Sequence, residues 1–169
     1  MSRVEVDLNL SLKPSFVRAL FYEKDWVKAV GVRRGCKLKE NCFSEFWSGK
    51  WFQEVKPRES EDSVLNALLR GYQAVGLAVD PEDLDFIFIP VFLSQNTDYE
   101  RNVLKWCRKL WRKVDSFEDV LRFDFRVIGS SYQLSALNKC LKQFRDVLEI
   151  VEDVDVWSFR RELLSCYGV

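Results

Sequence analysis

One segment of the sequence constrains the fold more than any other: residues 84–93 are apolar on nearly every side. The four residues before it, Asp80-Pro81-Glu82-Asp83, carry the features of a helix start. They offer an N-cap carboxylate, a proline at the first helical position and acidic side chains in the first turn. A helix that is apolar all round has to be buried. The sequence therefore predicts a helical domain built around a central helix over residues 84–93.

The N-terminal third of the sequence has a different hydrophobic period. Apolar and polar residues alternate over residues 4–12, which is typical of a half-buried strand. Two further β-prone runs, 17–22 and 26–32, are separated by a polar tip that suits a hairpin turn, and residues 37–55 are rich in aromatics. These patterns predict a small antiparallel sheet.

From residue 57 onward the apolar residues recur at helical spacing. The predicted fold class is therefore α+β, with a β-rich N-terminal domain over residues 1–56 followed by a mainly helical domain over 57–169. Besides the central helix, helices are expected over 63–73, 102–113, a short stretch beginning at Ser116, 134–150 and 156–164.

The composition excludes several kinds of chemistry. The chain has no histidine, so no Ser-His-Asp site and no His-ligated zinc site can form within it. The five cysteines include no C-x-x-C pair, which leaves no zinc-ribbon, thioredoxin-like or iron–sulfur spacing. The thiols are expected to be reduced and to act as small buried hydrophobes. No cofactor and no metal are expected.

No apolar run is long enough to cross a bilayer, and residues 1–5 begin no signal-peptide core. These features predict a cytoplasmic protein, associated with the nucleoid, that has no membrane partner.

The net charge is zero, but its distribution is uneven. Residues 99–145 carry 11 basic and 5 acidic side chains, a balance of +6. The basic residues of the helix expected there allow two interpretations, a strip that faces phosphates or an ordinary solvated helix face. They are Arg101, Lys105, Arg108, Lys109, Arg112 and Lys113.

Polar residues follow the central helix directly, in the order Ser94-Gln95-Asn96-Thr97-Asp98. In one interpretation this is a connecting loop in which Asn96, Thr97 or Asp98 caps the next helix. In the other, the loop faces a polar ligand, because amide side chains both donate and accept and can bond base edges exposed when a nucleotide leaves the stack.

Three segments in order resemble the helix-hairpin-helix DNA glycosylases, the superfamily of endonuclease III and the 8-oxoguanine glycosylases. Residues 80–98 are similar to that family's apolar core helix and its Leu-Ser-x-Gln turn. Residues 127–137, with Ile128-Gly129 and Tyr132, are similar to its Ile-Gly-x-Tyr-x-x-Lys-Ala segment. Residues 161–169 resemble the approach to the hairpin, ending at Gly168-Val169.

The resemblance implies roles for particular residues. Gln95 would fill the space of an extruded base, with Asn96 and Thr97 beside it. Tyr132 would lie near the base pocket or the DNA strand, although a core aromatic with a satisfied hydroxyl remains the alternative. Gly168 would belong to a phosphate-binding hairpin. Independently of the resemblance, the phosphate-facing interpretation of the basic helix would place Arg101 and Lys105 against the DNA backbone.

The family's catalytic Asp and Lys lie beyond the Gly-Val pair, so the resemblance assigns no catalytic residue here. It implies a DNA repair protein, the N-terminal portion of a base-excision glycosylase, whose partner is double-stranded DNA with a lesion or mismatch. A second chain that supplies the C-terminal half, or a homodimer, is expected. The alternative is a non-catalytic protein–protein interaction or assembly subunit that exposes apolar faces near Leu93 and Leu163.

Overall fold

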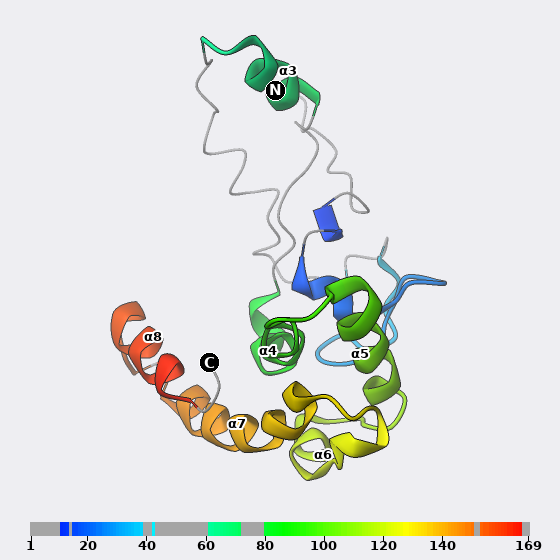
Figure 1. The fold of residues 1–169 in the computed structure, drawn as a ribbon, viewed down its shortest axis with the longest axis vertical. Coiled ribbons are helices and arrows are strands. Elements are labelled where there is room, and N and C mark those ends of the chain that lie inside the picture. Colours follow the sequence, from blue (N-terminus) through cyan, green and yellow to red (C-terminus); the bar gives the residue numbers. More distant parts are fainter. Residues whose placement is uncertain are drawn as a thin grey trace.

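The computed structural model describes residues 11–13, 15–38, 42, 61–71, 80–150 and 153–166. In this part of the chain, helices gather around α4 (Leu84–Leu93), with a two-stranded sheet beside them (Figure 1). The mixed α+β class is thus confirmed at this level. The other elements are η1 (Phe16–Leu20), β1 (Phe21–Tyr22), β2 (Val27–Lys28), α3 (Ser63–Gly71), η3 (Pro81–Asp83), η4 (Tyr99–Val103), α5 (Leu104–Trp111), α6 (Phe117–Arg122), η5 (Phe125–Val127), α7 (Tyr132–Glu149) and α8 (Val156–Ser165).

The predicted hairpin is present but shorter than expected. Strands β1 and β2 pair antiparallel, with Phe21 opposite Lys28 and Tyr22 opposite Val27, and the polar tip forms the turn. The sequence predicts a strand for the residues before β1, yet they form the 3-10 helix η1. The side chain of Ser15 caps it by accepting the N–H of Val17 at 3.1 Å.

The first predicted strand, 4–12, lies mostly outside the described residues, as does most of the aromatic-rich run 37–55. In the predicted strand 4–12, the described residues Ser11 and Leu12 have helical backbone, so the strand prediction is wrong at its C-terminal end.

Helix α4 occupies the centre of the core, as its sequence predicts. Six of its residues are buried, and the Phe88 ring stacks on Phe144 of α7 with centroids 3.7 Å apart. The Phe86 ring meets Trp111 of α5 edge to face at 5.8 Å. Aromatic pairs in these geometries add to the stabilisation that burial provides.

The described residues of the N-terminal segment share this core. Helix η1 packs against both α4 and α5, and Trp111 Nε1 donates a 2.7 Å hydrogen bond to the carbonyl of Ala19. Buried residues from Leu12 to Cys166 form one continuous cluster. The boundary expected at residues 56 and 57 lies outside the described residues, and the division into two domains remains a prediction.

Local capping explains where the later helices begin. Ser116 and Asp119 form a reciprocal capping box at α6. The Ser131 side chain accepts the N–H of Leu134 at the start of α7, and the Asp155 carboxylate accepts two N–H groups at the start of α8. These boundaries agree with the predicted helices to within a few residues.

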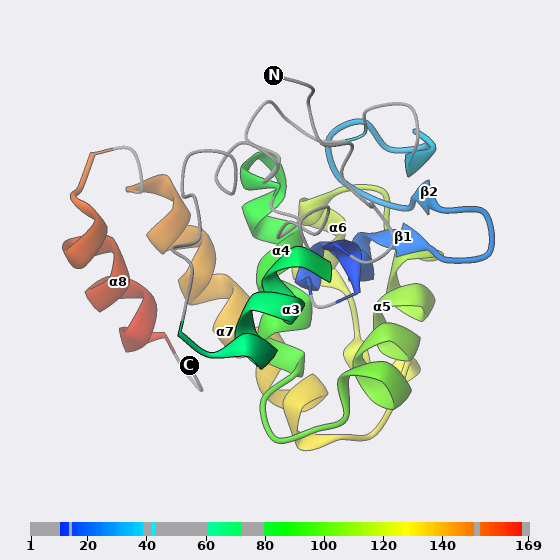
Figure 2. The same ribbon diagram turned by 90° about the horizontal axis from the view of Figure 1, so that it is seen from above.

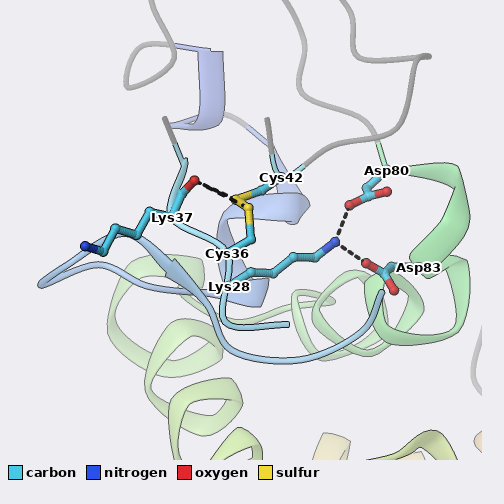
Figure 3. The surroundings of a disulfide bond; sticks show 6 residues. All are labelled: Lys28, Cys36, Lys37, Cys42, Asp80 and Asp83. Carbon is cyan, nitrogen blue, oxygen red and sulfur yellow. Dashed lines mark hydrogen bonds and ion pairs between the residues drawn. A yellow bond between two sulfur atoms is a disulfide. The ribbon is translucent and has the colours of Figure 1, made fainter. Parts of the chain in front are cut away.

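A buried ion cluster joins the hairpin to α4 (Figure 3). Lys28 of β2 places its Nζ 2.6 Å from Asp80 Oδ2 and forms a second ion pair with Asp83, and all three side chains are at most 1% exposed. Burial raises the pKa of Asp80, an effect that its hydrogen bond and ion pair with Lys28 oppose. The sequence predicted Asp80 as a helix N-cap, but its carboxylate makes no capping bond because it bonds the buried ammonium instead.

The neighbouring loop completes this cluster. Asp83 Oδ1 accepts the N–H of Val32 at 2.7 Å, and Gly31 lies against the same carboxylate with φ +84°. A side chain at Gly31 would overlap the Asp83 carboxylate, since a Cβ there would lie 2.1 Å from Oδ1. Only glycine combines this backbone angle with so close an approach.

A disulfide links Cys36 to Cys42 beside the ion cluster (Figure 3). It corrects the prediction that all five cysteines are reduced, which rested on the absence of a C-x-x-C pair. The hydrogen bond from the N–H of Lys28 to the carbonyl of Cys36, 2.9 Å long, connects the bridge to β2. The described free cysteines Cys107, Cys140 and Cys166 are buried, as expected.

Among the described residues, no helix has both the length and the apolar character that a bilayer crossing requires.

We expect Lys28→Met to lower the free energy of unfolding by about 3–5 kcal/mol, because it leaves two buried carboxylates without their cation. Urea denaturation at pH 7 measures the change. Lys24→Met, at the exposed hairpin tip, is the matched control and should shift the value by no more than about 0.5 kcal/mol. A loss below about 1 kcal/mol in Lys28→Met would mean that the carboxylates reach water or lose their charge.

Reduction of the Cys36–Cys42 bridge should destabilise the protein by about 2 kcal/mol, because the unfolded chain regains the freedom of the closed loop. Thermal unfolding with and without dithiothreitol measures this effect. The double variant Cys36→Ser/Cys42→Ser should melt at the temperature of the reduced wild type and show no response to the reductant. A wild-type melting curve unchanged by complete reduction would contradict the bracing role of the bridge.

Candidate nucleic-acid interface

The turn after α4 is held at both ends by hydrogen bonds of its own residues. At its start, Ser94 Oγ donates to the carbonyl of Val91 at 2.7 Å. At its end, Asp98 Oδ1 accepts the N–H of Arg101 at 2.8 Å, and Asn102 Nδ2 donates to Thr97 Oγ1 at 2.9 Å. The capping interpretation of this segment is therefore correct for Asp98.

Gln95 and Asn96 take no part in these capping bonds, and both are exposed. Asn96 has φ +54°, a left-handed backbone conformation that asparagine tolerates better than most residues. The backbone thus turns sharply at the two residues whose amide side chains the sequence singled out. Because the side chains of Gln95 and Asn96 are exposed and make no capping bond, they are accessible to a ligand.

A bond from a distant helix braces the same turn. Gln133 Nε2, in the first turn of α7, donates to the backbone carbonyl of Gln95 at 2.9 Å. Helices α4 and α7 pack directly against each other. The bond brings Tyr132 to the vicinity of the turn, and the Tyr132 side chain is 72% exposed. The structure therefore does not support the core-aromatic interpretation of Tyr132.

The loop that leads into α7 is packed closely on α5. Gly129 faces Trp106 and Leu134, and a Cβ at this glycine would lie 2.9 Å from Trp106 Nε1 and 2.7 Å from Leu134 Cδ1. Lys109 Nζ donates to the carbonyl of Ile128 at 3.0 Å. One face of α5 therefore borders the loop that precedes Tyr132.

The basic residues of the segment divide into two groups. Arg101 and Lys105 are exposed, and Lys105 lies one helical turn before Lys109. Arg108 instead forms an ion pair with Glu23, which also binds Arg18 at 2.7 Å. The expected phosphate-facing strip is thus wrong for Arg108, whose charge is matched within the fold. Arg112 and Lys113 are exposed beyond the end of α5.

Arg101 is not an isolated charge, because its Nε lies 3.7 Å from Asp98 Oδ2. The pair is exposed on both sides, and such pairs contribute little and exchange readily for another partner.

The structure therefore brings together most of the predicted site residues. The turn with Gln95, Asn96 and Thr97 meets the start of α7 with Tyr132, and Arg101 follows the turn directly. Gly168 lies outside the described residues. Sequence reasoning missed Gln133 and the close packing of Gly129, because the hydrogen bond and the packing contact both join segments far apart in the chain.

The described free thiols are poor candidates for nucleophiles. Burial raises the pKa of Cys107 strongly and that of Cys140 to about 12, so both stay protonated at neutral pH. In the described part of the chain, no group of three or more His, Cys, Asp or Glu residues is arranged to hold a metal ion.

Comparison with protein families, with curated proteins and with solved structures finds no match to this chain. The resemblance to the helix-hairpin-helix glycosylases therefore remains a prediction from the sequence.

The packing at Gly129 makes a prediction about the loop. Gly129→Ala should lower the free energy of unfolding by about 1–3 kcal/mol, because the added methyl group overlaps Trp106 and Leu134. Chemical denaturation measures the loss. Ser130→Ala, an exposed neighbour, is the control and should change stability by no more than about 0.5 kcal/mol. Equal stability of the two variants would show that the loop moves away from α5 without cost.

Proposed function

We propose that this chain binds double-stranded DNA at a lesion or mismatch, as the N-terminal portion of a base-excision glycosylase. The observation that carries the proposal is the Gln133–Gln95 hydrogen bond. It braces an exposed, amide-bearing turn against the helix that presents Tyr132. The glycosylase resemblance assigns contacts with DNA to these same two segments.

The chemistry of the turn suits a gap in a base stack. The amide side chains of Gln95 and Asn96 can donate to and accept from the edge of an unpaired base. Extruding a base costs a few kcal/mol, and the contacts made in the gap have to offset that cost. A braced turn loses less conformational entropy on entering the gap than a free loop would, so more of the contact energy remains.

Phosphate contacts come from the basic side chains next to the turn. Arg101 and Lys105 are exposed there, and their attraction to the backbone carries no sequence information. Tyr132 offers an exposed ring at the same end of the molecule, and aromatic rings stack on unpaired bases. Base contacts and phosphate contacts then lie side by side.

Base removal itself is assigned to no described residue. In the family that the chain resembles, the carboxylate and the lysine that act on the sugar follow the Gly-Val pair, and neither role is given to a residue of this chain. The assembly alternative expects exposed apolar faces near Leu93 and Leu163. Leu93 itself is fully buried and Leu163 is partly buried, whereas Val91 and Leu164 beside them are 37% and 53% exposed.

The test is fluorescence anisotropy with two duplexes, one intact and one with a tetrahydrofuran abasic-site analogue. Gln95→Ala should weaken binding to the abasic duplex by about 5- to 30-fold, which corresponds to roughly 1–2 kcal/mol, and leave the intact duplex nearly unaffected. Gln133→Met, which cannot donate to the Gln95 carbonyl, should weaken the same duplex by a smaller factor. Gln143→Ala, an exposed glutamine farther along α7, is the matched control.

A salt series measures how the basic side chains contribute to binding. Arg101→Gln/Lys105→Gln should weaken both duplexes equally and reduce the salt slope by about two, because neither side chain then neutralises a phosphate. Absence of binding, a binding constant independent of salt, or equal losses of affinity in Gln95→Ala for both duplexes would each contradict the proposal.

A further inference from the structure

The five cysteines of the chain fall into two groups with different surroundings. Cys36 and Cys42 form the disulfide, whereas Cys107, Cys140 and Cys166 are buried free thiols. Burial raises the pKa of each of these three thiols, so they stay protonated and react slowly with oxidants. Cysteines that respond to oxidants are accessible and often have a second cysteine within reach, and the Cys36–Cys42 pair meets both conditions.

The two sulfurs of the pair are not equivalent. Cys36 is half-buried, whereas Cys42 is fully buried. Cys42 Sγ lies 2.7 Å from the backbone carbonyl oxygen of Lys37, and Cys36 Sγ lies farther from the same oxygen, at 3.4 Å (Figure 3). When the bridge is open, this carbonyl can accept the Cys42 S–H, and burial also disfavours the charged form of that sulfur. A thiolate therefore forms more readily at Cys36.

The charges along the chain favour the same sulfur. Residues 32–39 contain four basic side chains and no acidic one, and Cys36 lies among them. Two of the basic side chains form ion pairs with Glu82 and Asp115, but these pairs are exposed and therefore weak. Positive charge near a cysteine stabilises its thiolate, which is the form that attacks an oxidant.

The backbone holds Cys36 in place without help from the bridge. Its carbonyl accepts the N–H of Lys28 at 2.9 Å, and its own N–H donates to the carbonyl of Arg33 at 3.1 Å. The Cα atoms of Cys36 and Cys42 are 5.6 Å apart, a separation that a disulfide spans. Figure 2 shows β2 and the segment after it at the edge of the molecule, on the side away from α8. A small oxidant in solution can therefore reach Cys36.

We propose that Cys36 and Cys42 are a reversible, peroxide-responsive pair, in which Cys36 attacks the peroxide and Cys42 then closes the disulfide. The site lies directly beside the strand that carries Lys28, so its oxidation state acts on the segment that is hydrogen-bonded to β2.

The chemistry takes place in two steps. The Cys36 thiolate attacks one oxygen of hydrogen peroxide, the O–O bond breaks and hydroxide leaves, so that Cys36 becomes a sulfenic acid. The Cys42 sulfur then attacks the Cys36 sulfur: the S–S bond forms, the S–O bond breaks, and hydroxide leaves with the Cys42 proton as water. In total, two thiols and one hydrogen peroxide give one disulfide and two water molecules, and two electrons pass from sulfur to the peroxide. A dithiol reverses the change by thiol–disulfide exchange and becomes a disulfide itself.

Trapping the sulfenic acid tests which sulfur attacks. Each full-length variant is reduced, freed of reductant and treated with hydrogen peroxide and dimedone, which forms a stable adduct with sulfenic acids, and peptide mass spectrometry locates the adduct. Cys36 in the variant Cys42→Ser should be labelled at least about tenfold faster than Cys42 in Cys36→Ser, because burial limits access and thiolate formation at Cys42. Cys107, Cys140 and Cys166 are internal controls and should stay unlabelled.

The wild-type chain tests closure and reversal without any substitution. Hydrogen peroxide should remove two thiols per reduced chain, and dithiothreitol should restore both under native conditions. Circular dichroism spectra of the serine variants that match the spectrum of the reduced wild type would show that the variants are folded. Three results would overturn the proposal: labelling of Cys42 as fast as that of Cys36, a reduced wild type that keeps its thiols in peroxide, or a bridge that dithiothreitol does not open. None of these measurements involves DNA, so their outcome is separate from that of the proposed function.

Discussion

The buried ion cluster of Lys28, Asp80 and Asp83 is the interaction on which the arrangement of this fold depends. It joins a hairpin near the N-terminus to the start of the central helix across more than fifty residues of sequence. Desolvating three charged groups is expensive, and the cost is offset only while each keeps its partner. The cluster therefore imposes one register on α4 relative to β2, and the neighbouring loop with Gly31 has to follow the Asp83 carboxylate.

The register of α4 has consequences at its other end. Once α4 is fixed, the turn that follows Leu93 emerges at a defined place and reaches the first turn of α7, where Gln133 binds the Gln95 carbonyl. The stacked Phe88 and Phe144 rings keep the same two helices together in the core. A buried ion cluster at one end of a helix and a braced polar turn at the other are thus parts of one rigid unit.

The periphery is built differently from this unit. Arg18, Glu23 and Arg108 form an ionic network across η1, the hairpin and α5, so these charges serve the fold. Helices α3 and α8, by contrast, expose apolar residues and contribute little to the core. The molecule therefore combines a well-packed centre with two peripheral helices that keep exposed apolar residues.

The sequence alone determined the helices from α4 onward, because local periodicity, Asp80-Pro81 and the Ser116 capping box act over a few residues. It also singled out the polar turn with Gln95 and Asn96. Tertiary structure decided what periodicity does not encode: that Asp80 binds a buried lysine rather than capping a helix, that Cys36 pairs with Cys42 six residues away, and that Arg108 forms an ion pair with Glu23. The Gln133 bond belongs to the same class. Each of these contacts depends on which segments meet in space, and the hydrophobic period along the chain carries no information about that.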